Sequence, residues 1–217
     1  CFGIVQYYCT LYDKVITFSK GHNYESVCFM YKDLLNLEVV KADDRGATEY
    51  INENPQHLVK YIGFGGLDYS SPLSLDAQFY KMANLSLEYK YFPFNSMRRD
   101  KEKEDKLFSK LVPENTDYIF LHDDADRGMK IDLPKGKYVV QAKKEHTSCI
   151  FDYCKIIEKA SEVHVIESSF FFLVDCVPYE NLEQSLYCHR YVRVGSFKSP
   201  IEIPHHQKKW SILHEKL

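Results

Sequence analysis

Apolar and polar positions in the first third of the chain switch repeatedly between helical and strand spacing. Apolar residues recur at helical spacing over 2–12, and short apolar runs follow at 15–18 and 37–40. Asn23 is a suitable N-cap for a helix between those two runs, and Ser71-Pro72 is a suitable start for a later helix. A third apolar run, 58–64, is read as another strand. This alternation predicts a parallel sheet covered by helices.

The alternation resumes after a break at residues 91–95. Strands are predicted over 117–121, 138–142, 163–166 and 186–192, and helices over 99–111, over 149–160, from Ser168 or Ser169, and over 207–217. The sequence therefore predicts an α/β protein of two small Rossmann-like halves, residues 1–92 and 93–203, followed by a terminal helix within 204–217.

Two of the predicted strands end directly in polar residues. Strand 117–121 is followed by the polar run 122–128, and strand 163–166 is followed by the Glu-Ser-Ser sequence at 167–169. Ligands of open α/β sheets bind beyond the carboxyl ends of the strands. Both segments are therefore candidates for one binding site.

Ser168 and Ser169 stand at the predicted start of a helix. Hydroxyl groups and backbone N–H groups at such a start can bind a phosphate, and the helix dipole favours its negative charge. A serine there is equally well explained as the N-cap of the helix. The position at the end of a buried strand favours the phosphate interpretation.

The polar run after strand 117–121 admits three interpretations. Arg127 can neutralise a diphosphate while His122 or an aspartate acts on a sugar or hydroxyl group, because arginine binds phosphate in a bidentate way and histidine titrates near neutral pH. Asp124 and Asp126 can instead hold a divalent metal between phosphates. The run can also be only a solvated turn, for which aspartate and glycine are common.

Composition and charge narrow the range of functions. The 217 residues are 45% hydrophobic and 27% charged, which suffices for a packed core, and the net charge of -3 disfavours a nucleic-acid partner. Seven cysteines without a Cys-x-x-Cys pair are expected to be mostly buried free thiols, which fits a reducing compartment. No apolar stretch reaches the roughly 20 residues that span a bilayer. We therefore expect a cytoplasmic protein without a transmembrane segment.

Three segments together resemble a known family. They are Tyr118-Ile-Phe-Leu-His-Asp-Asp with Arg127, Ile150-Phe-Asp-Tyr-Cys-Lys-Ile-Ile-Glu-Lys-Ala160, and Glu162-Val-His-Val-Ile-Glu-Ser-Ser-Phe-Phe172. Over about residues 117–175 the chain resembles the donor-binding half of GT-B glycosyltransferases, especially the fucosyltransferase-like group. The resemblance implies two halves facing a cleft, with the acceptor on the side of 1–92 and the nucleotide sugar on the side of 93–203.

The implied reaction is transfer of a sugar from a nucleotide diphosphate-sugar donor to a hydroxyl group of a glycan or another acceptor, with no cofactor. His122, Asp123 or Asp124 would act on the acceptor or the sugar, and arginine with the helix start would stabilise the diphosphate. His146 and Thr147 would reach the base or ribose, although Thr147 is equally an N-cap. The donor-binding residues would be Arg127, Gln141, His146, Thr147, Glu167, Ser168, Ser169 and Phe170.

Two other functions fit the same residues. A GT-A-like glycosyltransferase would use Asp124 and Asp126 to bind manganese or magnesium. A catalytically inactive α/β module would bind a nucleotide, a glycan or a protein partner.

Overall fold

The computed structural model describes residues 2–68, 70–71, 73–191 and 206–215. They form two compact units, Cys1–Met97 and Arg98–Leu217, each of which is described by itself. The division falls after Met97, whereas the sequence analysis placed it after residue 92. Its second boundary, after residue 203, and the end of its strand 186–192 lie outside the described residues.

The N-terminal unit contains a two-stranded parallel sheet. Strand β1 pairs with β2, with Val15 beside Leu37 and Ser19 beside Lys41. The predicted helix at 2–12 and the predicted strands at 15–18 and 37–40 are confirmed. The elements are α1 (Phe2–Leu11), β1 (Val15–Ser19), η1 (Gly21–Asn23), α2 (Tyr24–Tyr31), β2 (Leu37–Lys41), α3 (Asp44–Glu53), η2 (Phe64–Gly66), α4 (Leu75–Met82), η3 (Leu87–Lys90) and α5 (Phe92–Ser96).

Several parts of this unit differ from the sequence prediction, among them the start of α4, which has Ser74 and not Ser71 as its N-cap. Residues 58–62 form no strand in the described structure, and Leu58 and Tyr61 are 67% and 79% exposed. A strand needs a neighbour for its backbone groups, which a local apolar run does not reveal. Helix α3 was not predicted because it buries no side chain. Its start is fixed by Asp43, whose carboxylate accepts a hydrogen bond from the N–H of Gly46 at 2.8 Å.

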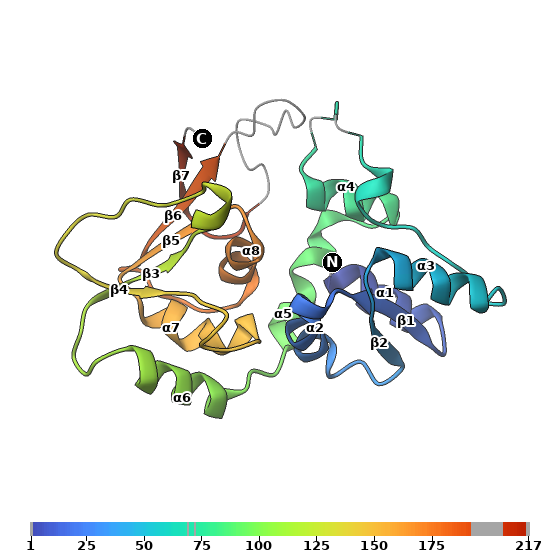
Figure 1. Ribbon diagram of the computed structural model, residues 1–217, viewed down its shortest axis with the longest axis horizontal. Coiled ribbons are helices and arrows are strands. Elements are labelled where there is room, and N and C mark those ends of the chain that lie inside the picture. The colour runs from blue at the N-terminus through green and yellow to red at the C-terminus, as the bar shows by residue number, and fades with distance from the viewer. Residues whose placement is uncertain (1, 69, 72, 192–205, 216–217) are drawn as a thin grey trace. The chain divides into compact units, whose positions relative to one another are not determined.

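The C-terminal unit is a five-stranded parallel sheet with the order β4-β3-β5-β6-β7 (Figure 1). Strand β3 is the first of this unit along the chain and lies inside the sheet, so strand addition reverses direction between β3 and β5, as in doubly wound folds. This confirms a Rossmann-like α/β character. The elements are α6 (Lys101–Leu111), β3 (Tyr118–His122), η4 (Ala125–Arg127), β4 (Tyr138–Gln141), η5 (Ile150–Tyr153), α7 (Cys154–Lys159), β5 (Glu162–Ile166), α8 (Ser169–Cys176), β6 (Ser185–Tyr191) and β7 (Trp210–Glu215).

The two faces of this sheet are covered differently. On one face the ring of Phe120 lies 5.7 Å from that of Tyr153 in η5 and 5.6 Å from that of Phe170 in α8. Helices α6 and α7 lie side by side, as Figure 1 shows. On the other face Leu121 clusters with Met129 and other buried residues of the segment that follows β3. Side chains alternate between the faces because successive residues of a strand point in opposite directions.

The last described element is a strand, so the predicted terminal helix is wrong. Strand β7 pairs in parallel with β6, with Trp210 beside Leu186. The carboxylate of Asp175 in α8 holds its start. This carboxylate, whose residue is 1% exposed, accepts hydrogen bonds from the N–H groups of Gln207 and Lys208 at 2.9 and 3.0 Å and from the Trp210 indole at 3.1 Å. These contacts span more than thirty residues, and local spacing cannot show them.

Replacing Asp175 by alanine is expected to destabilise the C-terminal unit by about 3 kcal/mol, because it leaves the buried Trp210 indole N–H and two partly buried backbone N–H groups without their acceptor. Trp210 is the single tryptophan, so its fluorescence during urea unfolding reports on this unit. Asp132→Ala is the control, because that side chain is 92% exposed. Equal unfolding midpoints for the two variants would show that the Asp175 contacts do not hold β7.

Candidate functional site

The carboxyl ends of β3 and β5 lie side by side. The two strands pair in parallel, with His122 beside Val165. Nδ1 of His122 lies 3.1 Å from Oγ of Ser168, and the ring of Phe170 lies 4.3 Å from the imidazole. The structure therefore brings together the two segments that the sequence analysis assigned to one site.

Ser168 is both the N-cap of α8 and the partner of His122. Its Oγ accepts a hydrogen bond from the N–H of Phe170 at 3.3 Å. A neutral histidine carries one ring proton and a serine one hydroxyl proton, so only one of the two occupies the contact between them. The other proton, on Nε2 of His122 or on Oγ of Ser168, is not used in that contact. Ser169 is exposed in the first turn of the helix.

Burial lowers the pKa of His122 to about 4, against the opposing effect of the neighbouring Asp123 and Asp124 carboxylates. The imidazole is therefore neutral at pH 7. A group with such a pKa is a weak general base, although it remains a good hydrogen-bond donor or acceptor.

Asp123 holds the start of the segment after β3. One carboxylate oxygen accepts a hydrogen bond from Nε2 of Gln141 at 2.8 Å, and the other accepts one from the N–H of Ile131 at 3.3 Å. Gln141, assigned to donor binding by the resemblance, is thus the partner of Asp123 at the end of β4. Both side chains fix the backbone next to the site.

Asp124 and Arg127 form an ion pair across η4. The Asp124 carboxylate also accepts the N–H of Arg127 at 3.3 Å, and its bonds to Arg127 lower the pKa of Asp124. The Arg127 side chain is 64% exposed, and Asp126 is exposed as well. Among the residues that the structure describes, no three His, Cys, Asp or Glu side chains converge as a metal site.

His146 and Thr147 connect to the site only through other side chains. Nδ1 of His146 lies 3.0 Å from Oη of Tyr153, whose ring lies 5.6 Å from that of Phe170. The Thr147 hydroxyl donates to the Asp152 carboxylate and accepts the N–H of Cys149 at 3.1 Å, so it orders the turn before η5.

Glu167 lies at the end of β5, and its side chain pairs with β6. Its carboxylate is 3.0 Å from Nε of Arg190, whose side chain is only 5% exposed. This arrangement gives Glu167 a structural role in joining the two strand ends.

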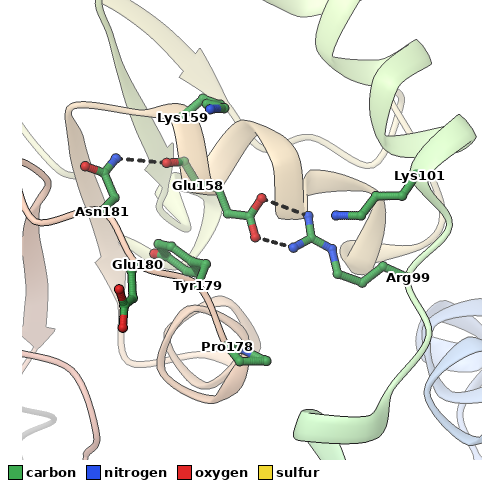
Figure 2. A pocket seen from close by; sticks show the side chains of 8 residues that line it. All are labelled: Arg99, Lys101, Glu158, Lys159, Pro178, Tyr179, Glu180 and Asn181. Carbon is green, nitrogen blue, oxygen red and sulfur yellow. Dashed lines mark hydrogen bonds and ion pairs between the residues drawn. The ribbon is translucent and has the colours of Figure 1, made fainter.

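A separate pocket of about 600 Å³ lies in the same unit (Figure 2). Arg99 lines it and donates four hydrogen bonds to Glu104 and Glu158, which leaves its side chain 12% exposed. Burial opposes the charge, but these bonds raise the pKa of Arg99. The sequence predicts Arg99 only as the first residue of the helix 99–111, and its spacing does not show this buried network. The pocket is lined by Arg99, Lys101, Glu158, Lys159, Pro178, Tyr179, Glu180 and Asn181, none of which belongs to the predicted site.

Comparison with protein-family models, with curated proteins and with solved structures finds no match to the chain. Within the described part of the chain, no helix has the length and apolar character to cross a membrane.

Two adjacent serines offer a matched test of the local geometry. Ser168→Ala is expected to lower the stability of the C-terminal unit by about 1 kcal/mol, because it removes the helix cap and the partner of His122. Ser169→Ala should change stability by less than about 0.5 kcal/mol, because that side chain is exposed. Urea unfolding followed by Trp210 fluorescence measures both. A larger loss for Ser169→Ala would contradict the assignment of the cap.

The titration of His122 gives a second expectation. Because its folded-state pKa of about 4 lies below the ordinary value of 6.5, the unfolded chain binds the proton first, and stability is lost as pH falls from 6.5 towards 4. The contribution reaches about 3 kcal/mol. His122→Gln, which keeps a hydrogen-bonding side chain but cannot be charged, should reduce this acid-induced loss. An unchanged pH profile of unfolding would refute the assignment.

Proposed function

We propose that the protein is a glycosyltransferase that binds the diphosphate of a nucleotide sugar, without a metal, at the carboxyl ends of β3 and β5. The observation that carries this proposal is the contact between His122 and Ser168 at the point where strand order reverses. Doubly wound sheets bind their ligands at that point. The resemblance of residues 117–175 to GT-B glycosyltransferases supplies the class of ligand.

The groups at this edge suit a diphosphate. Helix α8 begins there, and its first N–H groups and dipole favour an anion beside Ser168 and Ser169. Arg127 is exposed on the segment that follows β3, and a guanidinium binds phosphate oxygens in a bidentate way. His122, neutral at pH 7, adds a hydrogen bond without adding charge.

Transfer forms a bond between the acceptor oxygen and the anomeric carbon of the sugar and breaks the bond from that carbon to the diphosphate. The electron pair of the broken bond remains on the diphosphate, where Arg127 and the start of α8 stabilise the added charge. In this mechanism the guanidinium of Arg127 leaves the Asp124 carboxylate and binds the phosphate. The released Asp124 carboxylate then accepts the proton of the acceptor hydroxyl.

The acceptor side belongs to the N-terminal unit in this proposal, as the resemblance implies. A glycan or another hydroxyl acceptor and a cytoplasmic location remain predictions.

Calorimetric titration of UDP, GDP, ADP and dTDP, each with and without EDTA, tests the site directly. Arg127→Ala is expected to weaken binding of the preferred nucleotide tenfold or more, because it removes a charge-assisted contact. Lys135→Ala removes an exposed positive charge from the same segment and is the matched control, with binding unchanged. If none of the four nucleotides binds the wild-type protein, the proposal is wrong.

Asp124→Asn separates the arginine mechanism from the metal mechanism. Asparagine still caps η4 but no longer competes for Arg127, so nucleotide binding should be equal or tighter and unaffected by EDTA. Binding that requires manganese and disappears in this variant would instead support the GT-A-like alternative. Turnover of the matching nucleotide sugar, screened with several acceptors, then distinguishes an enzyme from an inactive binding module.

A further inference from the structure

Ionisable side chains occupy part of the face of the C-terminal sheet opposite Phe120. His164 of β5 lies in register with Tyr187 of β6, and its ring stacks on the tyrosine ring at 4.4 Å. Nδ1 of His164 lies 2.9 Å from Nε2 of His189, and Nε2 of His164 lies 3.1 Å from a Glu162 carboxylate oxygen. Both histidines are buried, at 6% and 5% exposure. Parallel sheets ordinarily bury apolar residues on both faces, so this cluster is unusual.

The geometry fixes the protons of the two rings. Glu162 is an acceptor when ionised, so Nε2 of His164 carries a proton. In the neutral pair Nδ1 of His164 is then an acceptor, and the N–H of His189 donates to it. One added proton is compatible with this contact, because a single proton still lies between the two nitrogens. A second added proton places two N–H groups and two positive charges against each other, and the contact is lost.

The surrounding charges limit protonation further. Nζ of Lys137 lies 2.6 Å from a carboxylate oxygen of Glu162 and 3.5 Å from one of Asp117. Lys137 and His164 therefore contact the same Glu162 carboxylate. The ionisable groups that contact the pair in the described part of the chain include Glu162 of the same strand, Tyr187 of β6 and, through Glu162, Lys137 and Asp117. Burial lowers the pKa of His164 despite the hydrogen bond to Glu162.

We propose that the pair of His164 and His189 is an acid-sensitive latch between β5 and β6. At neutral pH the shared proton joins the two strands across the buried face. In acid the second proton separates the rings and loosens β6, the strand that carries β7 on its other side. The latch requires no ligand and is independent of the proposed glycosyltransferase activity.

Urea unfolding from pH 7.5 to 5, followed by Trp210 fluorescence, tests the latch through His189→Gln. Glutamine can donate to Nδ1 of His164 but cannot be protonated. Between pH 6.5 and 5 the unfolding equilibrium constant of the wild type should rise more steeply than that of the variant, by up to tenfold per pH unit for each proton bound on unfolding. His214→Gln, an exposed position on β7, is the control and should follow the wild type.

Imidazole ¹⁵N NMR of the wild-type protein is a second measurement, and it does not require any variant to fold. We expect one Nε2-protonated neutral ring for His164 at pH 7.5 and two coupled titration steps for the pair. Parallel pH profiles for wild type and His189→Gln would overturn the proposal. So would two independent single-step titrations near pH 6.5 in the folded protein.

Discussion

The parallel pairing of β3 with β5 is the constraint on which the C-terminal unit depends. It places His122 beside Val165, and the chain then needs only a short turn to bring Ser168 against the imidazole. The same register sets Phe120 beside Val163 on the face that α8 and η5 cover. A one-residue slip would reverse both faces, so core packing and the candidate site specify the same register.

The two faces of this sheet differ, because one of them adds a buried hydrogen-bonded cluster to its apolar packing. The Phe120 face is stabilised by aromatic and aliphatic packing, which is non-directional and tolerates small adjustments. The opposite face places Glu162, His164 and His189 in hydrogen bonds that each require one donor and one acceptor. Buried polar groups of this kind stabilise a structure only while every partner is present. The hydrogen bonds of this face therefore depend on the protonation state of His164 and His189.

Much of the C-terminal unit is predictable because its strands are short apolar runs bounded by polar residues. Local spacing identified β3, β4, β5 and β6 and placed the start of α8 at Ser168 or Ser169. It could not identify β7, whose strand conformation depends on β6 and on the distant carboxylate of Asp175. Local spacing also identified candidate site residues, but not the side chains with which they form hydrogen bonds. The pairing of Asp123 with Gln141, and of Arg99 with Glu158, joins positions eighteen and fifty-nine residues apart.

The side chains at the carboxyl ends of β3 and β5 already contact one another, and a ligand that binds there must replace these contacts. Arg127 already pairs with Asp124, and Ser168 already pairs with His122. A neutral sugar offers hydrogen bonds no stronger than the ones it would replace, so it gains little from this edge. A diphosphate competes differently, because its charge attracts the guanidinium as strongly as a carboxylate does and also interacts with the start of α8. In the proposed function, an anionic ligand is therefore preferred at this edge, and Asp124 competes with it for Arg127.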